Sequence, residues 1–321
     1  MRSCSLGQTG YSIAPLVLGG NVFGWTIDEA TSFKVLDAFV DHGFDAIDTA
    51  DCYSAWAPGN KGGESETIIG NWLASRPGQR DKLKIFTKVG SVNGGPHAGG
   101  LTEPYIIQAV ERSLKRLQTD VIDLYFAHWP DPSGTSYAET LGAFDKLMKA
   151  GKVKAIGVSN VDASQLSASF EAAKSNGLPA YQVLQPEYNL YDRSSYEGPL
   201  RDLCIAKKLG VITYFSLASG FLSGKYRSSA DFGKSQRGGG MAKYLDDKGK
   251  AIFAALDDVS TRHSAKPAEV ALAWLMAREG VTAPIASATG AAHVASFAKA
   301  TALSLSTDDM AILTAAGESH S

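Results

Sequence analysis

The sequence predicts a single (β/α)8 TIM barrel that spans residues 1–321. Two observations support this α/β fold class. Short apolar segments alternate with helical patterns from residue 14 onwards, and that alternation favours parallel strands joined by right-handed crossovers. The length of 321 residues also suits such a barrel, which typically needs about 250 residues plus insertions. Because no stretch rich in proline or serine marks a boundary, we expect one domain.

Eight apolar segments are expected to be the barrel strands, since strands covered by helices are apolar nearly throughout. They span residues 16–18, 46–48, 84–88, 121–127, 154–158, 181–185, 211–215 and 284–286. The chain before them, residues 2–13, carries Gly7 and Gly10 at its centre, which is typical of a β-hairpin. We expect this hairpin to cover the bottom of the barrel.

Helix signals lie between the strands. Thr26 and Glu29 have the spacing of a capping box, and Gly43 is placed to end the helix that follows. Two later helices are expected over residues 137–150 and 267–278. Glycine follows the last turn of both, and proline begins the second.

Two glycine-rich insertions interrupt the alternation. Residues 91–100 follow the third strand, and residues 216–248 follow the seventh. Because active sites of such barrels lie at the carboxyl ends of the strands, both insertions are expected to be lids over that mouth. Ordinary surface loops are the alternative interpretation.

A doubly wound sheet is the rival architecture. It would carry a G-x-G-x-x-G motif between its first strand and helix. Residues 18–24 read Leu-Gly-Gly-Asn-Val-Phe-Gly instead, so the barrel is the better prediction.

Composition and charge exclude several classes of protein. The net charge is −2 with 31 basic residues, so no strong field favours nucleic acid or an anionic membrane. No apolar run approaches the roughly eighteen residues of a membrane span, and the N-terminus lacks the apolar core of a signal peptide. The three cysteines are odd in number and scattered, which favours a reducing compartment. We expect a soluble, cytoplasmic protein.

Polar residues lie at or near the ends of most expected strands. Asp48, Tyr53, Lys88 and His128 combine a carboxylate, a phenol, an ammonium and an imidazole. Since the strand ends of a barrel meet at one mouth, these four groups are expected to lie together. The combination suits proton transfer to a carbonyl oxygen. The other polar strand ends are Ser159, Asn160, Gln185, Tyr214 and Ser287.

With these motifs in place, the chain resembles the aldo-keto reductases over nearly its full length. The segments similar to that family's markers are residues 43–53, 86–88, 123–128, 157–160 and 185–189. The resemblance implies that Tyr53 is the general acid and that His128 holds the substrate oxygen. It further implies that Asp48 orients Lys88, whose positive charge would lower the pKa of Tyr53 by roughly 1–3 units.

The resemblance also implies a reduced nicotinamide dinucleotide as cofactor. Ser159, Asn160 and Gln185 match residues that bind the nicotinamide carboxamide, and Tyr214 matches the aromatic residue on which the ring stacks. Residues 216–225 resemble the loop that closes over the pyrophosphate. The remaining expected cofactor contacts are Gly20, Asn21, Ser216, Leu217, Ser219, Gly220, Lys225, Ser287, Thr289 and His293.

One segment departs from the family pattern G-A-S-R-x-x-Q. Gly290 stands where an arginine binds the ribose 2′-phosphate, and His293 replaces the glutamine. We expect NADP(H) first and NAD(H) as the alternative. The residues that could compensate for the missing arginine are Thr289, His293, Lys225 and Arg237.

Aromatic residues are expected near the mouth. Phe23, Trp25, Trp56 and Trp129 follow strands or catalytic positions, which indicates an apolar substrate pocket. Ordinary packing at the barrel edge is the alternative. Cys52, beside Tyr53, is interpreted first as a small apolar residue.

The predicted function is interconversion of a carbonyl compound and an alcohol by a nicotinamide-dependent oxidoreductase with a small-molecule substrate. A redox-sensing regulatory subunit that binds a cofactor and a protein partner is the alternative. A metal-dependent barrel hydrolase would need paired ligands such as His-x-His. The six histidines, at positions 42, 97, 128, 263, 293 and 320, are scattered, so we expect no metal. The sequence does not predict an oligomeric state.

Overall fold

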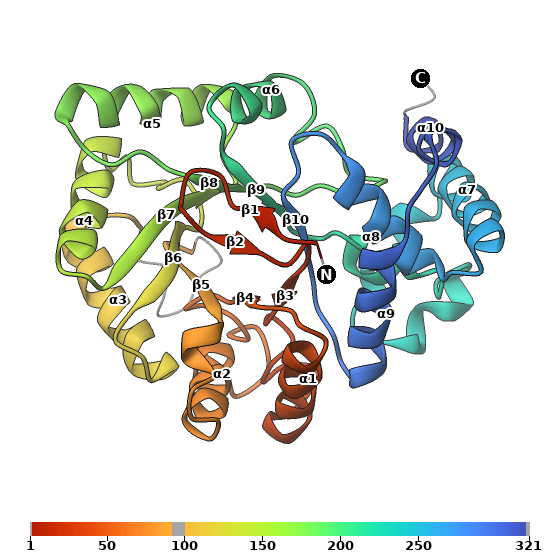
Figure 1. Cartoon of the computed structure of the whole chain (residues 1–321), viewed down its shortest axis with the longest axis horizontal. Coiled ribbons are helices and arrows are strands. Elements are labelled where there is room, and N and C mark those ends of the chain that lie inside the picture. The colour runs from red at the N-terminus through yellow and green to blue at the C-terminus, as the bar shows by residue number, and fades with distance from the viewer. Residues whose placement is uncertain (1, 92–99, 319–321) are drawn as a thin grey trace.

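The computed structural model describes residues 2–91 and 100–318, and these residues form a closed barrel of parallel strands (Figure 1). Each strand pairs with its neighbours in the chain, and the last strand pairs with the first to close the barrel. The predicted fold is therefore confirmed. The barrel strands are β3 (Val17–Gly19), β4 (Ala46–Asp48), β5 (Lys84–Val89), β6 (Ile122–Ala127), β7 (Val153–Ser159), β8 (Val183–Gln185), β9 (Gly210–Thr213) and β10 (Ala283–Ala286).

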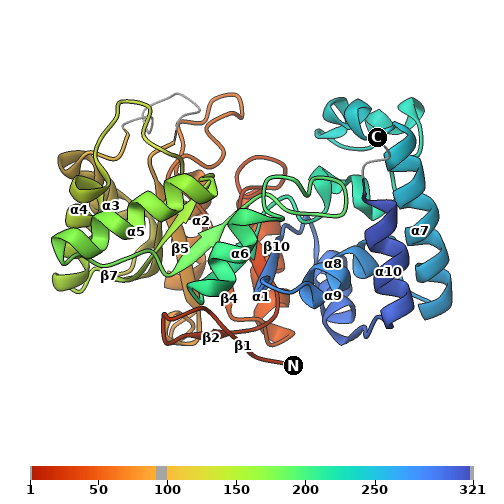
Figure 2. The same cartoon turned by 90° about the horizontal axis from the view of Figure 1, so that it is seen from above.

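Helices surround the barrel and cover the outer face of the strands (Figures 1 and 2). In chain order they are α1 (Glu29–Asp41), α2 (Glu64–Ala74), α3 (Glu103–Leu117), α4 (Tyr137–Lys149), α5 (Ala163–Asn176), α6 (Pro199–Ala206), α7 (Asp247–His263), α8 (Pro267–Ala277), α9 (Ala291–Ala302) and α10 (Thr307–Ala316). A short 3-10 turn, η1 (Arg80–Lys82), precedes β5. Within the described part of the chain, no helix is long and apolar enough to cross a membrane.

The start of α1 differs from the prediction. Asp28, not Thr26, caps this helix: its carboxylate accepts a hydrogen bond from the Thr31 backbone N–H at 2.8 Å. Asp28 directly precedes the first helical residue and has an extended backbone, which is the geometry that a capping side chain requires. Thr26 instead lies in the preceding loop.

The N-terminal hairpin consists of β1 (Cys4–Ser5) and β2 (Ser12–Ile13), and it lies across one end of the barrel (Figure 1). Leu6 and Ile13 are fully buried and join the apolar cluster inside the barrel. The hairpin therefore closes the bottom of the barrel, opposite the carboxyl ends of the strands. The strand residues in this cluster are Val17, Ala46, Phe86, Leu124, Phe126, Ala155, Val183, Ile212, Ala283 and Ile285.

This inner cluster explains where the predicted site residues point. Side chains alternate between the two faces of a strand. Asp48 lies two residues after Ala46, and Lys88 lies two residues after Phe86, so both face the barrel interior above the apolar layer. The same spacing relates inner-layer residues to His128, Gln185, Tyr214 and Ser287.

The insertion after β9 forms three short helical turns, η2 (Ala218–Ser223), η3 (Ser229–Lys234) and η4 (Gly238–Tyr244). The predicted lid at 91–100 lies almost entirely outside the described residues.

Gly7 provides a test of the hairpin contact. Its φ is +55°, and a β-carbon there would overlap the backbone of Gly210 and of Gln182. Gly10 also has positive φ, +78°, but open space at its β-carbon position. Gly10→Ala should lower the free energy of unfolding by about 1 kcal/mol, the cost of a left-handed alanine. Gly7→Ala should lower it by about 2–4 kcal/mol, because overlap adds to that cost. Equal urea midpoints for the two variants would contradict this close contact between the hairpin and the barrel.

Candidate active site

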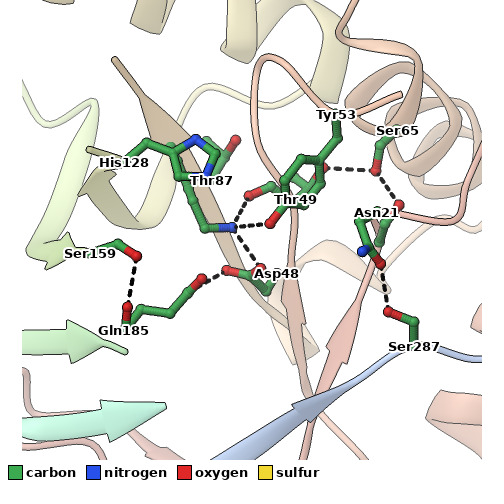
Figure 3. Close-up of polar contacts among 12 residues, drawn as sticks. Asn21, Asp48, Thr49, Tyr53, Ser65, Thr87, His128, Ser159, Gln185 and Ser287 are labelled. Carbon is green, nitrogen blue, oxygen red and sulfur yellow. Dashed lines mark hydrogen bonds and ion pairs between the residues drawn. The ribbon is translucent and has the colours of Figure 1, made fainter. Parts of the chain in front are cut away.

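Lys88 is the centre of the site and is fully buried. Its ammonium nitrogen donates three hydrogen bonds: to Asp48 Oδ2 at 2.6 Å, to the Thr49 carbonyl at 2.7 Å and to Tyr53 Oη at 2.8 Å (Figure 3). An ammonium has three N–H donors, so its hydrogen-bonding capacity is completely used. Lys88 therefore ties the strand residue Asp48 to Tyr53 in the loop after β4.

The carboxylate of Asp48 is oriented from its other side by β8. Gln185 Nε2 donates to Asp48 Oδ1 at 2.9 Å, and Ser159 Oγ donates to the Gln185 carbonyl at 2.7 Å (Figure 3). Burial raises the pKa of Asp48, while Lys88 and Gln185 act in the opposite direction. Each carboxylate oxygen thus has a fixed donor.

The pKa of Tyr53 differs from the expectation. Burial and then the negative charge of Asp48 raise this pKa well above its usual value. The expected net lowering of this pKa is not found, because burial and the Asp48 carboxylate outweigh the effect of the neighbouring ammonium. Tyr53 therefore keeps its proton at neutral pH, in the form that can donate it.

His128 is neutral in the site. Burial, followed by the positive charge of Lys88, lowers its pKa well below the usual value. The ring lies edge-on to Tyr53 with centroids 6.0 Å apart, and Nδ1 lies 3.7 Å from Cys52 Sγ. A neutral imidazole beside a phenol can offer a hydrogen bond to a substrate oxygen without competing for its proton.

Asn160 connects His128 with Tyr214. Its backbone is left-handed, with φ of +58°, and its Nδ2 donates to the His128 carbonyl at 2.8 Å. Its Oδ1 accepts a hydrogen bond from Tyr214 Oη at 2.7 Å. The amide thus fixes the Tyr214 ring against the end of β7.

These residues surround a cavity of about 710 Å³ at the carboxyl ends of the strands. Most of the predicted site residues line it. They are Asn21, Asp48, Tyr53, Trp56, His128, Trp129, Ser159, Asn160, Gln185, Tyr214, Ser216, Leu217, Ser219, Gly220, Lys225, Ser287, Thr289 and His293.

Four predicted residues do not line the cavity. Lys88 is buried beneath its floor, and Gly20 instead accepts a hydrogen bond from Ser65 Oγ at 2.7 Å. Phe23 is fully buried in the outer core, so its assignment to the substrate pocket is wrong. Trp25 is not a lining residue either, since it packs edge-on against Trp56 with ring centroids 5.4 Å apart.

Trp56 and Trp129 are the predicted aromatic residues that reach the cavity. Trp56 is 48% exposed, and its ring is 6.0 Å from that of Tyr53. Phe215, which the sequence did not single out, also lines the cavity and is 42% exposed. Large exposed aromatic rings on the lining of the cavity indicate a surface that receives an apolar group.

Arg237, which the sequence offered as a possible replacement for the missing arginine, also lines the cavity. It reaches the cavity from the insertion after β9, and its guanidinium lies 5.1 Å from the ring centre of Trp25. Its Nη2 is buried and has no hydrogen-bond partner among the described residues. Because a buried guanidinium needs acceptors, this group is available to an anionic or carbonyl oxygen of a ligand.

One trio of possible metal ligands occurs among the described residues. Atoms of Asp51, Cys52 and His128 lie within 4.8 Å of one another. Burial raises the pKa of Cys52 to about 12 and raises that of Asp51. Both groups therefore hold protons that a metal would have to displace, and the trio is a poor donor set.

The comparisons with known proteins agree with this geometry. A model described as "Aldo/keto reductase family" matches residues 15–318. The chain belongs to this family. As an aldo/keto reductase it is an oxidoreductase, and the family's activity depends on nicotinamide cofactors. The resemblance seen in the sequence is confirmed.

Three relatives show the extent of the similarity. Uncharacterized oxidoreductase YrpG of Bacillus subtilis (strain 168) is 35% identical over 89% of this chain and 86% of its own length. Aldo-keto reductase YhdN of the same strain is 30% identical over 96% and 91% of the two chains. A probable voltage-gated potassium channel subunit beta of Arabidopsis thaliana is 30% identical over 90% and 88%.

The buried ion pair predicts a specific stability pattern. Lys88→Met should lower the free energy of unfolding by about 3–5 kcal/mol, because it leaves Asp48 buried without a counter-charge. Adding Asp48→Asn should recover much of that loss. The single variant should be more stable at pH 5 than at pH 8, since a carboxyl whose folded pKa is raised favours folding only when protonated. Denaturant titration at both pH values measures this, and a pH-independent loss would contradict it.

Proposed function

We propose that the protein interconverts an aldehyde or ketone and the corresponding alcohol, using NAD(P)(H) and Tyr53 as general acid and base. The observation that carries this proposal is the contact of Lys88 Nζ with both Tyr53 Oη and Asp48 at the floor of the cavity. This contact holds the protonated phenol of Tyr53 at a position that a ligand in the cavity can reach. No metal ion takes part in this scheme.

The chain's own residues supply the proton and its control. A bound nicotinamide would supply the hydride. During reduction, Tyr53 donates its phenolic proton to the carbonyl oxygen as negative charge develops there. Lys88 then stabilises the phenolate that remains, because its ammonium already contacts Oη. His128, held neutral by burial, hydrogen-bonds the same oxygen and orients the carbonyl. Oxidation follows these steps in reverse.

Several side chains fit a nicotinamide dinucleotide. Ser159, Asn160 and Gln185 offer hydroxyl and amide groups at adjacent strand ends, and Tyr214 offers a ring fixed by Asn160. Ser287 Oγ donates to Asn21 Oδ1 at 2.6 Å and joins β10 to the loop after β3 (Figure 3). The cations nearest the phosphates would be Lys225 and Arg237, both on the lining of the cavity. We therefore assign the nicotinamide to the strand ends and the phosphates to the insertion after β9.

The rings of Trp56, Trp129 and Phe215 support a substrate with an apolar body. The alternative, a regulatory subunit, is suggested by the relative named as a potassium channel subunit. The intact arrangement of Tyr53, Lys88 and Asp48 favours turnover. A steady-state assay with generic aldehydes and both reduced dinucleotides distinguishes the two functions.

Tyr53→Phe tests the general acid. The substitution removes the transferable proton and keeps the ring, so kcat should fall by about 10²- to 10⁴-fold while the dissociation constant of the cofactor changes little. Tyr11→Phe is the matched control, because Tyr11 lies in the hairpin and hydrogen-bonds Asp123. It should leave kcat unchanged. Reduction by the Tyr53 variant within threefold of the wild type would exclude this residue as the acid.

Gly290 tests the choice of cofactor. We expect NADPH to be preferred, with a ratio of kcat/KM for NADPH over NADH below about 10³, because a charged contact worth roughly 1.5–3 kcal/mol is missing. Gly290 has open space at its β-carbon position, and Gly290→Arg should raise that ratio through the KM for NADPH. Gly290→Met, of similar length without charge, is the control. Equal KM values for NADPH in the two variants would place the 2′-phosphate elsewhere.

A further inference from the structure

One wall of the cavity gathers positive charge around a histidine. Lys225 follows η2, Lys266 precedes α8, and His293 lies in the first turn of α9. Lys225 and His293 line the cavity, and the charges of both lysines act on the imidazole. Lys225 and His293 thus reach the cavity from elements distant in sequence, and Lys266 lies close enough for its charge to act on the ring.

The charged groups that act on His293 are Lys225 and Lys266, both positive. Glu269 of α8, which packs against α9, is buried and already engaged: it accepts hydrogen bonds from Ser296 Oγ at 2.7 Å and from the Lys266 backbone N–H at 2.9 Å. Helix α1 also packs against α9. Two of the three carboxylates of α1 are bound to α2 or to the residues that follow it: Glu29 accepts from Asn71, and Asp37 pairs with Arg76.

The hydrogen bonds of His293 indicate its resting tautomer. The Thr289 backbone N–H points at Nδ1 with a distance of 3.2 Å, and Thr289 Oγ1 lies 3.3 Å from the same nitrogen. An N–H can only donate, so Nδ1 accepts and the neutral ring carries its proton on Nε2. A protonated Nδ1 could no longer accept from the Thr289 backbone N–H, but the Thr289 hydroxyl can turn and accept a hydrogen bond from it.

The charge state of the His293 imidazole follows from its surroundings. Partial burial, then the positive charges of Lys225 and Lys266, lower the pKa of His293. A phosphate dianion bound among these groups would offset the charges of the two lysines, and a negative charge beside an imidazole favours its charged form.

We propose that His293 takes up a proton when the ribose 2′-phosphate of NADPH binds beside it, so that affinity for NADPH, but not for NADH, increases as pH falls. This inference rests on the proposed function, because it assigns the 2′-phosphate to this wall of the cavity. Position 293 is the one at which histidine replaces the expected glutamine, which cannot titrate. His293 is therefore a specificity-determining residue whose contribution is set by pH.

The sign of the effect separates it from titration of the phosphate itself. A phosphate monoester loses its second proton near pH 6, and protonating it would weaken NADPH binding at low pH. Protonation of His293 would strengthen binding. Between pH 8.5 and 6.5 the phosphate is mostly dianionic, so the histidine effect should dominate there.

Fluorescence titration of both reduced dinucleotides at pH 6.5, 7.5 and 8.5 tests the proposal. For the wild type, the ratio of the NADH to the NADPH dissociation constant should rise about three- to tenfold from pH 8.5 to 6.5, within the limit set by uptake of one proton. His293→Gln should make this ratio independent of pH. His42→Gln, an exposed histidine at the end of α1, is the matched control and should behave as the wild type.

Calorimetry gives a second readout. NADPH binding near pH 7.5 should take up a fraction of a proton, measured in two buffers of different ionisation enthalpy, and His293→Gln should abolish this uptake.

A ratio of dissociation constants that does not change with pH in the wild type, or one that still changes with pH in the glutamine variant, would overturn the role of His293. If neither dinucleotide bound at any pH, the proposed function itself would fail. Binding of both with a flat ratio would reject this inference alone.

Discussion

The buried ion pair between Lys88 and Asp48 is the interaction on which the site depends. An ammonium and a carboxylate inside a barrel are each costly to remove from water, and they persist only when the geometry satisfies both. Here every donor of Lys88 has an acceptor, and each oxygen of Asp48 has a donor. The same requirement brings Tyr53 to the floor of the cavity, because its hydroxyl is the third partner of the ammonium.

Protonation states follow from this arrangement. Burial keeps the proton on Tyr53 and keeps His128 neutral, and the charge of Asp48 adds to the first effect while the charge of Lys88 adds to the second. The floor of the cavity therefore holds a proton donor and little net charge. The cations that reach the cavity, Lys225 and Arg237, come from the insertion after β9. The nicotinamide of a reduced dinucleotide is uncharged, whereas its phosphates are strongly anionic. Such a ligand would fit this division of charge with its nicotinamide at the floor and its phosphates beside the insertion after β9.

The same division separates what the family shares from what this chain changes. The floor residues match the family pattern, and the family model spans residues 15–318. The wall that would meet the 2′-phosphate departs from it, with Gly290 and His293 in place of arginine and glutamine. The proposed chemistry at the floor and the proposed discrimination at the wall lie on different elements, β4–β6 and β10–α9, so one could change without disturbing the other.

The sequence by itself determined the barrel and the inward direction of its polar strand ends. Strand geometry alternates side chains with a period of two, so Asp48, Lys88 and Gln185 could be assigned to one interior from the pattern alone. Interactions that depend on neighbours distant in the chain were not predictable in this way. Phe23 proved to be core, and the pKa of Tyr53 moved opposite to the expectation. Only the tertiary structure decided these points, because burial and electrostatic field are sums over all surrounding groups, whereas periodicity is a property of the local backbone.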